Sequence, residues 1–415
     1  MIKKITVIFI IFLSAHYSFS QKNNTSPYSF FGIGEETSNK TVEELSMGEI
    51  GVAFNSPLKL TFSNPASFAS LRLTNYALGL ETKTLRINDG TNKGTAASTA
   101  LSYLALGIPV GNKAGFSFGL IPNTTVGYSL KEQLSDTETN FYTGEGGTNK
   151  VFLGIGYRLA KGLNFGLEGS YIFGNIKNTI ANTRVIEPVS PFPTVYLSEA
   201  KIKGFAALAG VQYEKQLKEQ LNITLGATID FNTNLTNEGN EYMYSTITST
   251  PDTTVNKSFK GDIKKPLKTT LGAGIGNENK WYAGIEYSFQ DALELSGGAL
   301  DKNTLISYGN SNRLSLGGFY IPKFNSITSY WQRMTYRAGL KFKKTGLIIE
   351  DTAINDFGMS FGVGLPIGQQ LSNLNLGFEL GKRGEIKNGL IKENYINFRL
   401  SLTLNDKWFR KKEIY

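Results

Sequence analysis

From Leu163 to Leu404 the chain repeats one pattern, in which apolar residues alternate with small or polar ones before a turn. The clearest copy runs from Leu221 to Phe231, with Leu, Ile, Leu, Ala, Ile and Phe on one face and Asn, Thr, Gly, Thr and Asp on the other. Successive side chains of a strand point to opposite faces, so this pattern predicts strands with one apolar and one polar face. A soluble sandwich could use such strands. Long repetition behind an export sequence instead favours a transmembrane β-barrel, with its apolar face toward lipid.

The alternation and the turns together predict fourteen strands. They are expected near residues 75–85, 97–109, 113–130, 149–160, 162–176, 201–215, 221–234, 262–276, 280–290, 310–321, 332–343, 356–366, 372–383 and 393–404. An even number of strands places the start of the first strand and the end of the last strand on the same side of the membrane, as in single-chain bacterial outer-membrane barrels. The last strand is expected to close the barrel against the first.

The connections between these strands alternate in length. Residues 110–112, 160–162 and 276–279 are tight turns, whereas 177–200, 235–261 and 291–309 are long and polar. Short periplasmic turns and long outer loops are usual in such barrels. The connection at 322–331 is an exception, because it is long but falls on the periplasmic side.

The N-terminus has the three parts of a secretory signal peptide. A basic start with Lys3 and Lys4 precedes an apolar run over 5–13, and small residues at 18–20 precede Gln21. The apolar run is too short to cross a bilayer as a helix. We therefore expect cleavage after Ser20, which gives a signal peptide over 1–20 and predicts export to the outer membrane.

The composition excludes several kinds of chemistry. The chain has no cysteine, and its one histidine, His16, lies within the expected signal peptide. The mature protein therefore lacks the groups for thiol catalysis, a histidine-based serine triad or a thiolate or imidazole metal site. The sequence also shows no spacing of Ser and Lys, or of paired carboxylates, that would support a hydrolase without histidine. We predict a protein that is not an enzyme and holds no metal or cofactor.

The charge balance is basic, with 43 Lys and Arg against 34 Asp and Glu and a pI near 9.2. These basic residues are scattered, apart from the tail at 410–412, and scattered charge does not favour nucleic acid as a partner. Anionic head groups of the outer-membrane lipid fit charges at strand ends better. The segment 407–415 is expected to form a basic periplasmic tail.

Charged and glycine residues occupy the inward face of the expected barrel. The charged ones are Glu81, Glu168, Glu286, Glu379, Arg158, Arg313, Arg337 and Arg399. Because a charge facing lipid is costly, these side chains should face a wet or ion-paired lumen, and we favour ion pairs that fill the barrel. Inward glycines at 154, 156, 362 and 364 would leave room for a plug.

Residues 21–72 precede the first strand and do not alternate. They contain a short helix expected near 41–47 and are too short, and too often interrupted by Gly and Pro, to form a domain of their own. Their apolar side chains need a place to be buried, and the lumen is the nearest one. We therefore expect an N-terminal hatch over 21–72 inside a barrel over 73–406.

This hatch resembles that of the FadL/TodX family of outer-membrane transporters for hydrophobic compounds. Family members carry a MGG-x-G-x-A…NPA pattern in a hatch that plugs a fourteen-stranded barrel. This chain has the segment 47–53 (MGEIGVA) and then Asn64-Pro65-Ala66, with Glu49 in place of the second glycine of the family. The opening SPYSFFGIG and the ending NDKWFRKKEIY are similar to a branch typical of Bacteroidetes envelopes. The resemblance covers the mature chain in architecture, but its specific motifs lie in the hatch.

The third expected strand contains Pro122, which cannot donate a ladder hydrogen bond and must interrupt pairing or form a bulge. In the family, an inward kink of the third strand opens a side window for hydrophobic cargo. The resemblance implies that Asn64, Pro65 and Ala66 lie close to this kink, although an ordinary bulge is an equal alternative. The substrate-binding or gating residues expected on this basis are Asn64, Pro65, Ala66, Phe68, Phe118, Pro122, Phe192 and Tyr196, the last two on an outer loop.

Two functions follow from the resemblance. The first is passive uptake of hydrophobic small molecules, such as long-chain fatty acids or aromatic and aliphatic hydrocarbons, through hatch movement and lateral exit near Pro122. The second is a barrel of the same shape that does not transport and serves as an accessory subunit of an outer-membrane protein assembly or type IX secretion machine. The first hypothesis requires a hydrophobic ligand as partner, and the second requires other outer-membrane subunits.

Overall fold

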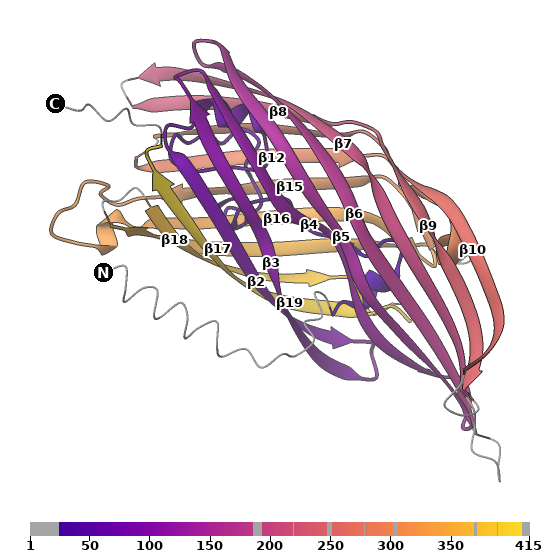
Figure 1. Ribbon diagram of the computed structural model, residues 1–415. Coiled ribbons are helices and arrows are strands. Elements are labelled where there is room, and N and C mark those ends of the chain that lie inside the picture. The colour runs from indigo at the N-terminus through magenta and orange to yellow at the C-terminus, as the bar shows by residue number, and fades with distance from the viewer. Residues whose placement is uncertain are drawn as a thin grey trace, which may run out of the picture.

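A computed structural model describes residues 25–185, 193–218, 220–246, 251–277, 279–301, 306–368, 372–387 and 389–408. The expected signal peptide, the outer-loop residue Phe192 and most of the basic tail lie outside these residues. Within them the chain forms one closed antiparallel barrel (Figure 1).

The barrel wall has fourteen crossings in its described part, as the sequence predicted. Ten are single strands: β2 (Thr74–Asn88), β3 (Lys93–Val110), β4 (Ala114–Gln133), β5 (Glu138–Ala160), β6 (Leu163–Arg184), β7 (Thr194–Lys218), β16 (Thr335–Ile349), β17 (Thr352–Ile367), β18 (Ser372–Arg383) and β19 (Lys392–Asp406). Four are broken into two pieces: β8 (Leu221–Asp230) with β9 (Thr233–Thr246), β10 (Pro251–Lys265) with β11 (Lys268–Asn277), β12 (Trp281–Gln290) with β13 (Glu294–Leu295), and β14 (Ile306–Tyr308) with β15 (Ser311–Tyr320).

The barrel closes between its last and first strands. β19 pairs with β2 over its whole length, from Lys392 opposite Asn88 to Asp406 opposite Thr74. This register confirms the predicted closure. The ring of Trp408, which follows β19, lies 5.5 Å from that of Tyr76, which is consistent with an aromatic belt at this end of the barrel.

Alternation along the strands separates a lipid-facing surface from the lumen. On β6, Phe165, Leu167 and Tyr171 are exposed on the outside, whereas Asn164 and Glu168 are buried inside. The same pattern on the neighbouring strands produces a continuous apolar outer surface. Such a surface suits hydrocarbon, and pairing between neighbouring strands satisfies their backbone amides within the sheet.

Two of the expected outer loops are instead mostly strand. β6 and β7 remain paired from Ile176 opposite Ala200 to Asn182 opposite Thr194, and β9 and β10 pair from Leu235 opposite Ile263 to Thr246 opposite Pro251, within the region expected as loop 235–261. These extensions run beyond the roughly ten residues that span a bilayer, so lipid no longer imposes apolar alternation on them. Figure 1 shows that β5, β6, β7, β9 and β10 reach much farther at this end than β16, β17 and β18.

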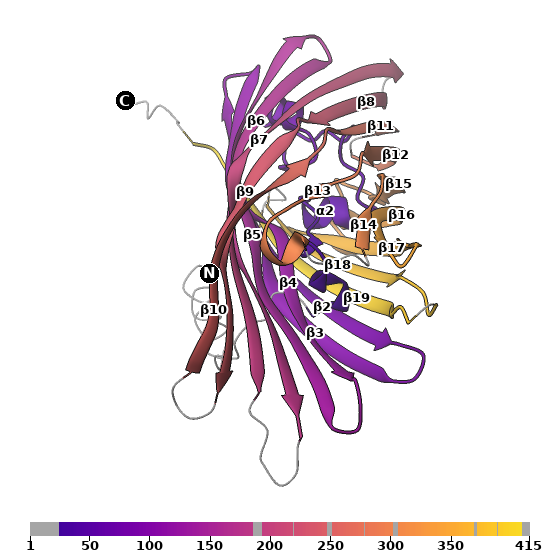
Figure 2. The ribbon, with the colours of Figure 1, turned by 90° about the vertical axis from the view of Figure 1, so that its right-hand side faces the viewer.

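The hatch lies inside this ring of strands. It contains the 3-10 helix η1 (Pro27–Phe30), β1 (Glu35–Glu36), α2 (Val42–Leu45) and the 3-10 helix η2 (Pro65–Ser70), and Figure 2 shows α2 within the ring. Two further 3-10 helices, η3 (Gly298–Asp301) and η4 (Trp331–Arg333), lie in connections between wall strands. None of the helices in the described ranges is long and apolar enough to span a membrane.

The short helix expected near 41–47 is α2. Thr41 caps it, since its hydroxyl accepts from the amide of Glu44 while the Glu44 carboxylate accepts from the amide of Thr41. This capping box stabilises a helix that is too short to persist alone. The same carboxylate also accepts the amides of Phe62 and Ser63, so Glu44 connects α2 to the second half of the hatch.

Candidate functional site

The Asn-Pro-Ala motif joins the hatch to the barrel wall. The Asn64 side chain caps η2 by accepting from the amide of Ala66 at 3.0 Å, and its Nδ2 donates to the carbonyls of Val52 at 2.9 Å and Val211 at 3.0 Å. Asn64 and Ala66 have no exposed surface. In this structure the motif is therefore a buried clamp between two parts of the hatch and strand β7.

Glycines in the wall allow this clamp to approach. A Cβ atom on Gly166 would lie 2.2 Å from the backbone nitrogen of Ala66, and one on Gly210 would lie 2.0 Å from Oδ1 of Asn64. Gly154 leaves room for the ring of Phe68 in the same way. The expectation that inward glycines make room for a plug is confirmed here and at positions 156 and 362, whereas Gly364 makes room for the wall residue Arg337.

Ion pairs hold the first half of the hatch. Glu286 of β12 is buried, and its Oε1 lies 2.9 Å from Nζ of Lys40 in the hatch and 2.7 Å from a guanidinium nitrogen of Arg313 on β15. Its Oε2 accepts the hatch amides of Gly51 and Val52 at 2.8 and 2.9 Å. One wall carboxylate thus binds three hatch groups.

Glu49 of the hatch is the centre of the adjacent network. Its carboxylate binds Arg313 at 2.7 Å and Lys341 of β16 at 2.9 Å. Lys341 also binds Glu379 at 2.7 Å, and Glu379 binds Arg399, which in turn pairs with Glu81. Most of the inward charges predicted from the sequence therefore form ion pairs inside the barrel, as expected, whereas Arg158 and Arg337 donate hydrogen bonds to uncharged side chains in the described part of the chain.

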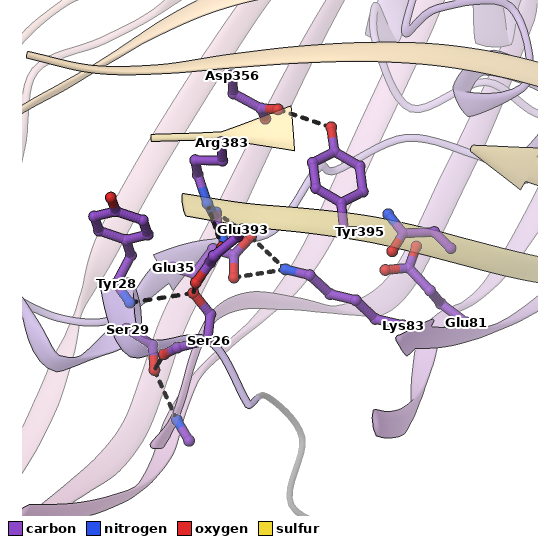
Figure 3. A network of polar contacts seen from close by, with 12 residues as sticks. Ser26, Tyr28, Ser29, Glu35, Glu81, Lys83, Asp356, Arg383, Glu393 and Tyr395 are labelled. Atoms are coloured by element: carbon purple, nitrogen blue, oxygen red, sulfur yellow. Dashed lines mark hydrogen bonds and ion pairs between the residues drawn. The ribbon is translucent and has the colours of Figure 1, made fainter. Parts of the chain in front are cut away.

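A second polar cluster holds the start of the hatch (Figure 3). Arg383 of β18 lies between Glu393 of β19, at 2.5 Å, and Glu35 of β1, at 2.6 Å. Glu35 also binds Lys83 of β2 at 2.7 Å, and the Ser26 hydroxyl donates to Glu393 at 2.6 Å. Three wall strands are joined here through hatch residues.

The charges of hatch and wall are complementary. Burial on its own would raise the pKa of Glu49, but the nearby Lys341 and Arg313 hold it well below its ordinary value. The pKa of Glu35 is likewise held well below its ordinary value against the effect of burial, by Arg383 and Lys83. Lys268, acting against burial and together with Lys265 and Lys343, lowers the pKa of Glu36. Three hatch carboxylates are thus charged anions in a wall that supplies cations.

The wall has a seam between β3 and β4. The two strands pair only from Leu104 opposite Leu120 to Val110 opposite Ala114, although both strands continue well past this point. The register of β4 against β5 shifts between Pro122 and Thr124, and the alternating burial of β4 ends at Ile121. From there to Tyr128 every residue except Pro122 is buried, which shows that this part of β4 leans into the lumen.

The hatch covers the edge of β4 that the seam exposes. Glu35 and Glu36 of β1 pair with Thr125 and Thr124, and Thr37 donates its amide to Asn123 at 3.0 Å and its hydroxyl to the carbonyl of Pro122. Strand pairing satisfies the polar backbone groups that the kink leaves free. Thr37 and β1, rather than the Asn-Pro-Ala motif expected from the resemblance, make these contacts at the kink.

The other expected site residues are dispersed. Phe118 faces outward on the lipid surface, where it pairs with Leu106 and Leu153. Tyr196 belongs to β7 rather than to a loop, and its hydroxyl donates to Glu241 at 2.5 Å. The structure therefore brings the four hatch residues together, but it does not join Phe118, Pro122 and Tyr196 to them.

The cavity beside the seam has a mixed lining, in which apolar residues such as Phe31, Ile33 and Leu295 accompany charged ones. It has a volume of about 350 Å³ and lies between the hatch and the wall, with Glu36, Lys265, Lys343 and Arg383 among the residues that line it. Among the described residues no cluster of His, Asp or Glu has the geometry of a metal site. Nothing in the sequence pointed to Thr37 or Lys341, whereas the replacement of a family glycine by Glu49 was visible.

Comparisons with known proteins agree with this architecture. The sequence model described as BamG matches residues 1–415. Three solved structures are similar in fold. The crystal structure of a Pseudomonas aeruginosa FadL homologue has a TM-score of 0.61 at 13% identity, over 89% of this chain and 99% of that one. The CymD monoaromatic hydrocarbon channel has a TM-score of 0.57 at 14% identity, over 91% and 99%. The Ralstonia pickettii toluene transporter TbuX has a TM-score of 0.54 at 14% identity, over 88% and 98%. Identities this low show a shared fold alone, and no curated protein matches the chain.

Proposed function

Because the chain belongs to the BamG family, whose model matches all of it, we propose that it is an accessory subunit of the machinery that assembles outer-membrane proteins. The family name supports this role through its link to the Bam assembly machinery. The fold is that of an outer-membrane barrel similar to the FadL-like channels. In the proposed role the barrel is a membrane-embedded scaffold whose ends bind other subunits.

The observation that carries this proposal is the firm attachment of the hatch. Glu49 binds both Arg313 and Lys341, and Glu286 binds Lys40 together with two hatch amides. Leaving one charge of a buried ion pair without its partner costs roughly 3–5 kcal/mol. Moving the hatch would separate several such pairs at once. A scaffold needs a hatch that stays in place, whereas uptake through the lumen needs one that moves.

Purification of the full-length protein from its own envelope, in a mild detergent, tests the proposal. We expect it to remain in a large complex that contains the core barrel of the assembly machinery, and we expect its depletion to lower the amounts of other outer-membrane barrels. A monodisperse monomer, together with unchanged barrel levels after depletion, would exclude the role.

Uptake of hydrophobic small molecules remains the second candidate, and the seam between β3 and β4 is the observation that favours it. The kink at Pro122 lies where the family resemblance implies a lateral exit. The adjacent cavity has both charged and apolar side chains in its lining, so the lining favours neither candidate function by itself.

A further inference from the structure

The short-turn end of the barrel contains a basic vestibule that neither the hatch nor the wall fills. It is a cavity of about 740 Å³ surrounded by the turns that follow β5, β7 and β11 and by the connection 321–334 between β15 and β16. A smaller cavity of about 180 Å³ shares Asn55, Arg158, Glu214 and Asn222 with it and reaches the underside of the hatch. The turns at this end are short, and the first barrel strand begins and the last one ends here. Both features are typical of the periplasmic end of such a barrel.

Positive charge dominates the vestibule. The described cationic residues that line the two cavities are Lys59, Arg72, Arg158, Lys161, Lys280 and Lys323, and Glu214 is the one described acidic residue among the lining. Glu214 is already held by the amides of Asn222 at 2.8 Å and Asn55 at 3.4 Å.

Arg72 and Arg158 both line the smaller cavity, and neither donates a hydrogen bond to a carboxylate within the described part of the chain. Arg72 donates to the carbonyls of Leu71 and Ala69, and Arg158 makes long hydrogen bonds of 3.4 and 3.5 Å to Asn164 and Ser70. Burial, followed by the neighbouring positive charge of Arg158, lowers the pKa of Arg72. Two like charges held together in a concave surface attract an anion.

The remaining lining indicates what kind of anion fits. Side-chain amides such as Gln220, Asn279 and Asn325 surround the vestibule, and an amide can both donate and accept hydrogen bonds. A peptide backbone offers both kinds of group, whereas an ionised phosphate only accepts. The cavity is also far larger than a phosphate group.

The connection 321–334 adds an apolar element beside the cations. Its residues Ile321–Asn325 line the vestibule, while Ile327 is 98% exposed and Trp331 is 70% exposed. Figure 1 shows this orange connection projecting from the short-turn end. Exposed Trp and large aliphatic residues next to a charged rim are typical of protein interfaces.

We propose that this vestibule binds an acidic segment of a protein partner that also contributes apolar side chains. The proposal rests on the proposed function, because it identifies the surface through which the assembly subunit would dock. The basic segment 410–412 of this chain does not complement the vestibule, which argues for a segment of another protein.

A binding experiment on the full-length protein in lipid nanodiscs tests this directly. The probe is a short fluorescein-labelled peptide rich in Asp and Glu with interspersed Leu, and its anisotropy reports binding. We expect binding that weakens as salt is added, and a loss of at least about ten-fold in the double variant Lys161→Glu/Lys280→Glu. Both lysines are exposed on the rim and form no ion pair with a described residue, so folding should be unaffected.

The matched control is Lys113→Glu/Lys407→Glu, which makes the same change of charge at the same end of the barrel but outside the vestibule lining. It should bind the probe like the parent. Equal weakening in both double variants would show a general charge effect and overturn the proposal, as would stronger binding to anionic lipid vesicles than to the peptide. A probe in which Lys replaces Asp and Glu should prefer the rim variant to the parent.

Co-purification separates this proposal from the function on which it rests. If the rim variant retains its envelope complex at the level of the parent, the vestibule is not the docking surface, while the role as a subunit stands. If the parent itself purifies alone, the proposed function fails whatever the rim variant does.

Discussion

At the scale of single residues, Glu49 explains how this hatch differs from the family pattern. Its backbone has φ 69°, a left-handed conformation that costs an ordinary residue roughly 1 kcal/mol and suits glycine, which the family pattern has at this position. The two ion pairs to Arg313 and Lys341 offset that cost. The departure itself was visible in the sequence. Its partners were not, because they come from strands 264 and 292 residues further along the chain.

Glu49→Gly should therefore loosen the hatch even though it restores the residue of the family pattern. The gain from relieving the backbone is roughly 1 kcal/mol, whereas leaving Arg313 and Lys341 short of a partner costs roughly 3 kcal/mol. We expect a lower urea midpoint in lipid bilayers and faster proteolysis of residues 26–72. Glu350→Gly is the matched control, since Glu350 also has a positive φ but lies exposed at an outer turn. That variant should be neutral or more stable, and a Glu49→Gly protein as stable as the parent would contradict the argument.

At the scale of elements, lipid determines how well the strands can be predicted. All fourteen crossings follow from alternation, because each must present apolar residues to hydrocarbon and polar ones to the lumen. The ends of β6, β7, β9 and β10 were missed because alternation is not imposed beyond the bilayer. The wall surface against which the hatch packs was partly visible in the sequence as inward glycines. Its contacts were not, since the irregular segment 25–72 has no periodicity that sets which side chain faces which strand.

The glycine seat gives a test within one strand. Gly166→Ala on β6 would place a methyl group 2.2 Å from the backbone of Ala66, which cannot move aside as a flexible side chain could. We expect a loss of roughly 1–3 kcal/mol in unfolding free energy and a hatch that is cut faster by protease. Gly169→Ala, on the outer face of the same strand, meets no atom within 4 Å and should leave both measurements unchanged. Similar behaviour of the two variants would mean that the hatch does not rest on this strand.

The attachment of the hatch should also depend on pH with a defined sign. Since the folded pKa values of Glu35, Glu36 and Glu49 lie below the unfolded value near 4.5, these carboxylates stabilise the hatch at any pH above that value. The contribution is lost as the pH falls through the folded pKa. Hydrogen exchange of residues 26–37, corrected for its intrinsic pH dependence, should be constant from pH 8 to about 5 and rise only in stronger acid. Faster exchange already between pH 7 and 6 would show that other groups control the hatch.

At the scale of the whole molecule, one barrel combines a lateral seam with a hatch that is bound on all sides. The seam favours a transporter, because it could form a lateral exit, whereas the ion pairs favour a scaffold. The two differ in whether residues 25–72 must move for the protein to work. No sequence pattern could decide this, because it depends on the summed energy of contacts between the hatch and distant strands.

A reversible lock on the hatch distinguishes the two functions in the intact protein. Glu36 lies opposite Thr124 across the pairing of β1 with β4, and paired strand residues have Cα atoms about 4.5–5.5 Å apart, within the range that a disulfide spans. The chain has no cysteine, so Glu36→Cys/Thr124→Cys would form a single bond. The ion pairs lost with Glu36 are the long ones, at 3.5 Å to Lys265 and 3.9 Å to Lys343. Thr82→Cys/Thr99→Cys, which joins β2 to β3 within the wall, is the control.

For a scaffold we expect the oxidised hatch variant to keep its envelope complex and to support normal levels of other barrels. For a transporter, oxidation would stop uptake of a long-chain fatty acid, reduction would restore it, and the wall variant would be unaffected. Loss of the complex on oxidation of the hatch variant alone would show that the hatch must move for assembly as well, and the static scaffold would then be wrong.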